Sequence, residues 1–149
     1  MEGAGRVGLD ELVRQALRMR PDRLVVGEVR GGEVIDLLSA LNTGHEGGCG
    51  TLHANSAADV PARLEALGVA AGLTRDAVHA QVAAGLDAVV HLVKERTGHR
   101  RMAEIGVVER AAGGSVTVVP AVRSSIAGEF AEAAAAHRLR SRLASELEC

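Results

Sequence analysis

Aromatic side chains are almost missing from this sequence of 149 residues, since Phe130 is the single aromatic residue and neither Trp nor Tyr occurs. The core must therefore be aliphatic, and platforms for stacking the bases of single-stranded nucleic acid are excluded. Lysine is equally scarce, because Lys94 is the only lysine among 17 basic residues. A P-loop requires the pattern G-x-x-x-x-G-K-[ST], and Lys94 follows Val93 and precedes Glu95, so this chain contains no such loop.

Excess charge is small as well, because 17 basic and 19 acidic residues give a net charge of -2. We expect no overall basic field that would hold a phosphate backbone or an anionic membrane, and hence no nucleic-acid partner. No apolar run approaches the roughly 20 residues that cross a bilayer. Cys49 and Cys149 do not make a disulfide framework, which suits a reducing compartment. The sequence therefore predicts a cytoplasmic domain.

The first half of the chain has the pattern of alternating helices and strands. Apolar residues at helical spacing begin at Leu9, and Pro21 ends that helix. The continuous apolar run within 23–29 predicts a buried strand of a parallel sheet. A second helix follows over 34–41, and a short strand is expected at 51–53. These elements indicate an α/β fold.

The second half has a different pattern. Ser56 and Asp59 form an S-x-x-D capping pattern before one helix, and Thr74 is positioned to cap the next. Three β-rich runs separated by glycine-containing turns then predict a small antiparallel meander. The Ala-rich end predicts a terminal helix. These expected elements are strands at 88–93, 102–108 and 116–122 and a helix at 125–147.

An acidic residue, Glu28, follows the first predicted strand. Ligands bind at the carboxyl ends of strands in open α/β sheets, and a carboxylate there can hold Mg²⁺ through water or orient an attacking water. The structural alternative is a glutamate that ends the strand and pairs with Arg30.

Two histidines, His45 and His53, flank a glycine-rich segment with Cys49 midway between them. One interpretation is a metal site, with Glu46 as an optional further ligand, although three intervening glycines disfavour a rigid set of ligands. A second interpretation is polar contact of the histidines with a phosphate or an acidic neighbour. The third is a plain glycine-rich connection with surface histidines.

These motifs in this order resemble the secretion ATPase superfamily of type II and type IV secretion and pilus assembly, in particular the tight-adherence (Flp) pilus ATPases and the VirB11-like branch. Residues 17–23 (LRMRPDR) and 26–33 (VGEVRGGE) are similar to the Walker B region of that family. Residues 42–45 (NTGH) and 51–56 (TLHANS) resemble its His box, and 63–65 (RLE) match a following Arg-Leu-Glu.

The resemblance implies the C-terminal half of a RecA-like P-loop NTPase core, with parallel strands and flanking helices, followed by the antiparallel meander and a terminal helix. It implies a hexamer that uses ATP and Mg²⁺ to drive protein secretion or pilin extrusion at inner-membrane platform proteins, peripheral to the inner face of the cell membrane. Glu28 would be the Walker B carboxylate near Mg²⁺, and His45 and His53 would communicate with the γ-phosphate and the neighbouring subunit. Glu33, Arg30 and Arg63 match further catalytic or nucleotide-binding positions.

The chain departs from the family pattern in having no Walker A loop. We therefore expect residues 1–124 to be the C-terminal part of the ATPase domain and 125–149 to be an Ala-rich helix, in a fragment that is inactive alone. The alternative is a non-catalytic interaction module that docks on the secretion ATPase or on its membrane platform.

Overall fold

The computed structural model describes residues 7–43 and 47–147, which divide into two compact units. Unit 1 is formed by residues up to His53 together with Leu64–Gly85, and unit 2 by Ala54–Arg63 together with the chain from Leu86 onward. None of the helices described in these ranges combines the length and the apolar character needed to cross a bilayer.

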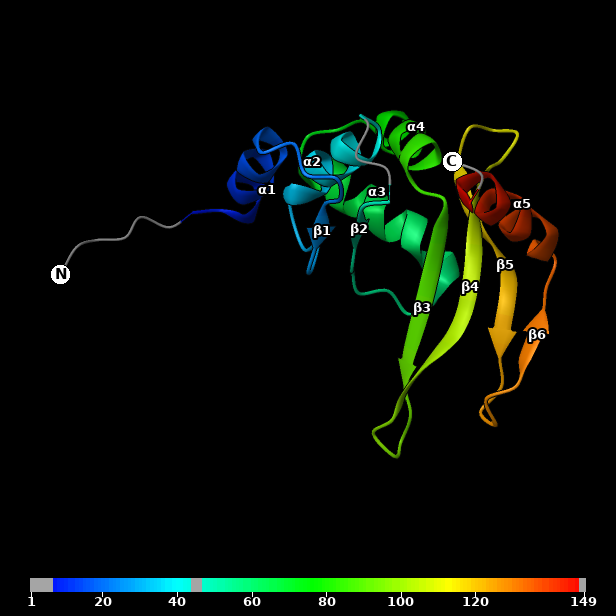
Figure 1. The fold of residues 1–149 in the computed structure, drawn as a ribbon. Helices are drawn as coiled ribbons and strands as arrows, with labels where there is room; N and C mark the ends of the chain where they lie inside the picture. Colours follow the sequence, from blue (N-terminus) through cyan, green and yellow to red (C-terminus); the bar gives the residue numbers. More distant parts are fainter. Residues whose placement is uncertain (1–6, 44–46, 148–149) are drawn as a thin grey trace. The chain divides into compact units, whose positions relative to one another are not determined.

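Unit 1 contains a short parallel sheet and helices. Its elements are α1 (Leu9–Arg18), β1 (Val25–Val26), α2 (Glu33–Leu41), β2 (Cys49–Gly50), most of α3 (Val60–Ala70) and α4 (Arg75–Gly85) (Figure 1). Helix α1 contacts α2, and α2 contacts α4. Strands β1 and β2 pair in parallel, with Val25 opposite Cys49. The predicted combination of parallel strands with flanking helices is confirmed for the part of the chain described.

The first strand differs from the expectation of a run buried on both faces. Leu24 and Val26 are buried, whereas Val25 between them is 69% exposed. Successive strand residues point to opposite faces, so only one face of β1 is covered within the structure described.

The second strand comprises Cys49–Gly50, and the expected strand at 51–53 is wrong in position. A Cβ at Gly50 would lie 2.9 Å from a methyl carbon of Leu37, so this position favours glycine because the two segments approach closely. The same glycine makes the sequence resemble a loop.

Unit 2 is an antiparallel sheet in the order β3-β4-β5-β6. Its strands are β3 (Ala88–Lys94), β4 (Arg100–Arg110), β5 (Val116–Ser124) and β6 (Phe130–Glu132). A bulge interrupts the β3–β4 register between His91 and Leu92. The short helix η1 (Ala57–Asp59) contacts β3, β4 and β5, and α5 (Ala136–Leu147) contacts β5. The predicted meander is confirmed and extended by one strand.

The terminal helix begins at Ala136 and not at residue 125 as expected. Gly128 adopts a positive φ of 81° in the turn after β5, and the following residues pair with β5 as β6. Ala135 is fully buried with Val107 and Ala121, and Leu139 of α5 packs against this cluster. Pairing and burial therefore override the helix propensity of the Ala-rich segment.

The two predicted helix caps have different outcomes. The Thr74 hydroxyl accepts a hydrogen bond of 3.2 Å from the Ala77 amide at the start of α4, as expected. The Ser56 hydroxyl instead donates to the Asp59 carboxylate at 2.7 Å, so it does not cap a backbone amide in the predicted manner.

Substituting Gly106 tests the close packing of β4 on β5. A Cβ at this position would lie 2.3 Å from Cγ1 of Val118, whose branched side chain has little rotamer freedom. We expect Gly106→Ala to lower the free energy of unfolding by about 1–3 kcal/mol, as overpacked cores do. Urea titration followed by circular dichroism measures this loss.

The matched control is Gly113→Ala in the same hairpin, where a Cβ would meet no atom within 4 Å and φ is not positive. This control should change stability by less than about 0.5 kcal/mol. Equal effects of the two substitutions would contradict the packing argument.

Candidate functional site

Backbone pairing brings two sequence motifs together in unit 1. The Cys49 amide donates to the Leu24 carbonyl at 2.9 Å, the Thr51 amide to Val26 at 3.3 Å, and the Val29 amide to Thr51 at 2.8 Å. The Thr51 hydroxyl donates to the Gly27 carbonyl. The parallel pairing therefore continues past the strands and aligns the segment that carries Glu28 with the segment that carries His53.

Glu28 lies between an arginine and a histidine. Its Oε1 atom is 2.6 Å from Nε of Arg30 and 2.9 Å from Nε2 of His53. The Glu28 side chain is 31% exposed, whereas those of Arg30 and His53 are 72% and 86% exposed. The two partners thus reach the carboxylate from the solvent side.

The charges around Glu28 keep it ionised. The Arg30 guanidinium beside it, together with the His53 ring, holds the pKa of the Glu28 carboxyl below its usual value despite some desolvation. At neutral pH the site therefore presents a carboxylate at the carboxyl end of β1. Glu28 pairs with Arg30, as the structural alternative for this glutamate predicts. His53 contacts the same carboxylate oxygen.

Glu33 is a buried carboxylate that holds the loop after β1. It is the first residue of α2 and is 8% exposed, and its Oε1 accepts hydrogen bonds from the backbone amides of Arg30 and Gly31, the latter at 2.9 Å. Burial raises the pKa of Glu33, but the backbone hydrogen bonds outweigh it and the pKa is lowered. Glu33 therefore fixes the backbone of Arg30 and Gly31.

The remaining candidate residues have separate locations. His45 and its optional metal-site neighbour Glu46 lie outside the described residues. Cys49 is an exposed free cysteine on β2. Arg63 is exposed on α3, in the part of that helix that belongs to unit 2. No group of three potential metal ligands occurs within 7–43 and 47–147.

Two polar connections between helices of unit 1 were not anticipated. Nε2 of the buried His79 lies 2.9 Å from Oε2 of Glu65, joining α4 to α3, and Arg75 pairs with the same oxygen at 3.2 Å. The hydrogen bond from His79, and to a lesser extent the one from Arg75, lowers the pKa of Glu65.

A second connection joins the end of α2 to α4. The side-chain amide of Asn42 donates to the carbonyls of Leu38 and Gln81. Glu65 lies in the Arg-Leu-Glu motif, but its partner His79 is 14 positions away in the sequence. Asn42 and Gln81 are 39 positions apart, and no local sequence pattern links residues at such separations.

The chain is a mixed α/β protein, and its likeness to a solved secretion ATPase shows an ATPase-like fold. The VirB11 ATPase of the Brucella suis type IV secretion system, solved in complex with sulphate, matches with a TM-score of 0.62 and 27% sequence identity over 68% of this chain and 32% of that chain.

The sequence relatives agree with the structural neighbour. The model of the family described as "Type II/IV secretion system protein" matches residues 1–139, and the chain belongs to this family. A protein of Mycobacterium tuberculosis named "Putative conjugal transfer protein" is 57% identical over 95% of this chain and 40% of its own length. The type IV secretion system protein PtlH of Bordetella pertussis is 53% identical over 34% of this chain and 15% of its own length. The predicted resemblance to the type II/IV secretion ATPases is thereby confirmed, and the chain spans about two fifths of the Mycobacterium tuberculosis relative.

Glu33→Gln tests the buried carboxylate. Gln keeps the size of the side chain and one acceptor oxygen but removes the negative charge, so we expect a loss of about 1–2 kcal/mol in the free energy of unfolding at pH 7. Because the pKa of Glu33 is lower in the folded state, its stabilisation is present above its unfolded pKa and is lost as pH falls through the folded pKa. Chemical unfolding at several pH values measures both effects.

The control for this substitution is Glu129→Gln, which changes an exposed glutamate in a turn. We expect it to leave stability within about 0.5 kcal/mol of the unmodified chain. If the deficit of Glu33→Gln does not shrink in acid, the charged hydrogen bonds are not its cause.

Proposed function

We propose that this chain supplies the Walker B and His-box part of a hexameric secretion ATPase with a RecA-like P-loop core, which couples ATP hydrolysis to protein secretion or pilin extrusion. In this proposal residues 1–124 are the C-terminal part of the ATPase domain, and residues beyond 124 are a C-terminal extension. An ATPase of this kind also needs a Walker A loop, which these 149 residues do not contain. Hydrolysis is therefore a property of a longer protein.

The observation that carries the proposal is the 2.9 Å approach of Glu28 and His53. The two residues come from separate motifs 25 positions apart, yet parallel pairing places their side chains on one charged oxygen. Direct contact between two such groups lets a change at the one that detects the nucleotide act on the one that positions the attacking water. This geometry supports Glu28 as the Walker B carboxylate and His53 as its nucleotide-sensitive partner.

The carboxylate also fits a magnesium ion. Oε1 of Glu28 is buried and, among the described residues, has ion-pair neighbours but no hydrogen bond of normal geometry. An ionised carboxylate is the ligand type that Mg²⁺ takes, often through an intervening water. Bound Mg²⁺ would neutralise charge on the ATP phosphates, while Glu28 holds a water and Arg30 keeps the carboxylate ionised.

The other candidate residues have supporting roles in this proposal. Glu33 acts as a positioning residue, since its burial and its hydrogen bonds to backbone amides support fixing Arg30 and not contact with ATP. Arg30 contributes positive charge toward the nucleotide, and His45 acts with His53 at the γ-phosphate. Arg63, which belongs to unit 2, stays a nucleotide-binding candidate on the family resemblance alone. Partners are further copies of the ATPase and membrane platform proteins, which would place the enzyme in the cytoplasm at the inner face of the membrane.

Glu28→Gln tests the Walker B assignment in a chimera in which this chain replaces the matching segment of the Mycobacterium tuberculosis relative. The substitution keeps the shape of the side chain and removes the charge that positions metal and water. We expect kcat for ATP hydrolysis to fall at least about 100-fold, as is typical for such groups, with nucleotide affinity retained. Steady-state ATPase assays and calorimetry with ATP measure the two quantities.

The matched control is Glu132→Gln, which removes another glutamate that is paired with an arginine, Arg140, but lies on β6. Its ATPase rate should equal that of the unmodified chimera. A folded chimera without ATP hydrolysis would contradict the proposed function and favour a docking module. Unchanged kcat in Glu28→Gln would contradict the role of this residue.

His53→Ala and His45→Ala distinguish nucleotide sensing from metal binding. We expect each substitution to lower the ATPase rate of the chimera while its circular dichroism spectrum is unchanged and its zinc content stays below stoichiometric. The reason is that His53 contacts the same oxygen of Glu28 as Arg30 does, and an arginine is not a metal ligand. Stoichiometric zinc that is lost with either histidine, together with activity restored by added zinc, would support the metal site instead.

A further inference from the structure

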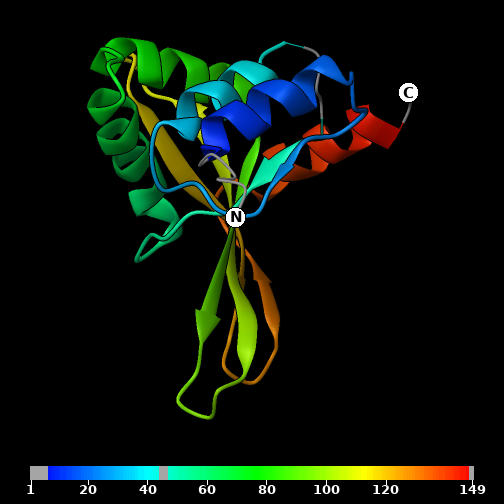
Figure 2. The same ribbon diagram turned by 90° about the vertical axis from the view of Figure 1, so that its left-hand side faces the viewer.

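Two hairpins of unit 2 end together. The β3–β4 hairpin turns between Lys94 and Arg100, and the β5–β6 hairpin turns between Ser124 and Phe130. Because β4 and β5 are antiparallel neighbours, with Glu104 opposite Arg123, both turns lie at the same end of the sheet. Figures 1 and 2 show the two loops at this end from directions at right angles. We call residues 94–101 and 125–130 the hairpin end.

An arginine bridges the two hairpins. Nε of Arg101 pairs with Glu95 at 2.9 Å, and its Nη1 donates to the carbonyl and the hydroxyl of Ser124 at 3.1 and 3.0 Å. The Ser124 hydroxyl in turn donates to the Met102 carbonyl. These contacts cross from the first hairpin to the second directly beside the turns. The hairpin end is therefore a single surface and not two independent loops.

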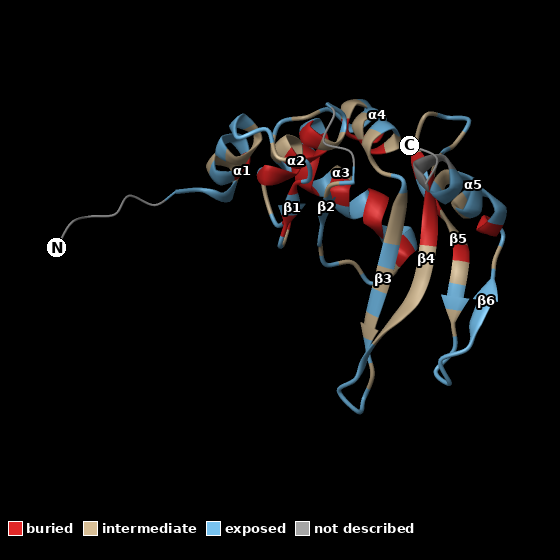
Figure 3. Cartoon of the chain, viewed as in Figure 1, coloured by how far each residue is buried: buried red, intermediate tan, exposed pale blue. Residues whose placement is uncertain are grey.

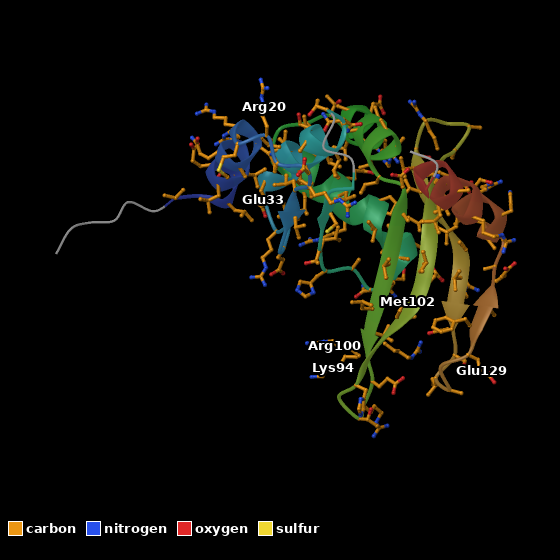
Figure 4. The ribbon with its side chains drawn as sticks, viewed as in Figure 1. Arg20, Glu33, Lys94, Arg100, Met102 and Glu129 are labelled. Carbon is orange, nitrogen blue, oxygen red and sulfur yellow. The ribbon has the colours of Figure 1, made fainter. Side chains whose placement is uncertain are left out.

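This surface gathers positive charge from a chain that is slightly acidic overall. Its basic residues are Lys94, Arg96, Arg100 and Arg101, and its acidic residues are Glu95 and Glu129. Lys94, Arg96 and Arg100 are all exposed, and Lys94 and Arg100 lie directly opposite each other in the β3–β4 register (Figure 4). The net charge of the whole chain therefore does not describe the charge at this end of the sheet.

Large apolar side chains stand exposed at and beside the same turns. Ile126 and Phe130 of the hairpin end are 82% and 69% exposed, and Leu92 and Val90 of β3 are 60% and 58% exposed. Farther along the strands, residues 106–108 of β4 are buried, and Figure 3 shows this change from buried to exposed toward the turns. The sheet thus extends beyond the part that η1 and α5 cover within unit 2.

We propose that the hairpin end binds an anionic lipid surface. Clustered Lys and Arg are attracted to anionic headgroups, and apolar side chains beside them gain free energy by entering the boundary of the acyl chains. Ile126, at the tip of a turn next to this cluster, suits insertion into lipid, whereas a nucleic acid would offer it no apolar phase. Because the chain carries a net charge of -2, attraction at this end and repulsion elsewhere also orient the protein on the surface. This inference adds a lipid-binding surface to the membrane location in the proposed function, and it does not depend on Glu28 or on ATP.

Co-sedimentation of this chain with vesicles tests the proposal. We expect binding to phosphatidylcholine vesicles that contain phosphatidylglycerol, none to pure phosphatidylcholine, and weakening at raised ionic strength. Replacing Lys94, Arg96 and Arg100 together by Gln should weaken binding about 100-fold, since each basic residue near an anionic surface contributes roughly a factor of five. Ile126→Ser should weaken binding at every ionic strength.

A matched control carries the same change of charge elsewhere, with Arg18, Arg20 and Arg23 of unit 1 replaced by Gln. This control should bind at least tenfold more tightly than the variant of the hairpin end. The chain has no tryptophan, so Phe130→Trp introduces a single reporter whose emission should shift to the blue on anionic vesicles only. Absence of binding to anionic vesicles, equal losses in the two triple variants, or an unshifted emission of the bound Trp variant would each overturn the proposal.

Discussion

Parallel pairing between residues 24–29 and 49–53 is the constraint on which the site depends. The hydrogen bonds of Thr51 to Val26, Gly27 and Val29 set the register, and this register brings His53 to Glu28. A shift by one residue would turn His53 to the other face of the segment. The buried carboxylate of Glu33 holds the opposite side of the same loop through Arg30 and Gly31. The geometry of the charged group is thus fixed by backbone contacts more than by the side chains themselves.

Much of the site was accessible from sequence because its signals are local. An acid after an apolar run predicts a carboxylate at a strand end, and Glu28 has that position in the structure. The family resemblance indicated both boxes, and the comparisons confirm the family. One interpretation of the histidines was contact with an acidic neighbour, but the sequence did not identify Glu28 as the partner of His53, since that choice depends on a register that period and composition leave open. His79 and Asn42 were missed for the same reason, because their partners lie on other helices.

Errors in the predicted fold arise where tertiary contacts oppose local preference. Gly50 indicates a loop by composition, yet close approach to Leu37 favours a glycine in a strand. The Ala-rich segment after Ser125 favours a helix, yet β5 offers it a pairing edge and Gly128 supplies the left-handed turn that permits it. Net charge concealed the basic hairpin end, because a sum over the chain carries no information on where charges gather. In each case the missing information is which distant segment lies alongside.

Strand β3 forms one edge of the four-stranded sheet and carries exposed Val90 and Leu92. A long, flat apolar edge of this kind invites another chain to add a strand and begin aggregation. The register shift between His91 and Leu92 places an extra residue, Ala103, in the neighbouring strand β4 and so increases the local twist of the pair, and Lys94 places a charge at the end of β3. An incoming strand would have to follow this twist and would meet the charge of Lys94. The bulge in β4 and the charge of Lys94 therefore protect the protein against the growth of intermolecular sheets while the apolar side chains of β3 stay exposed.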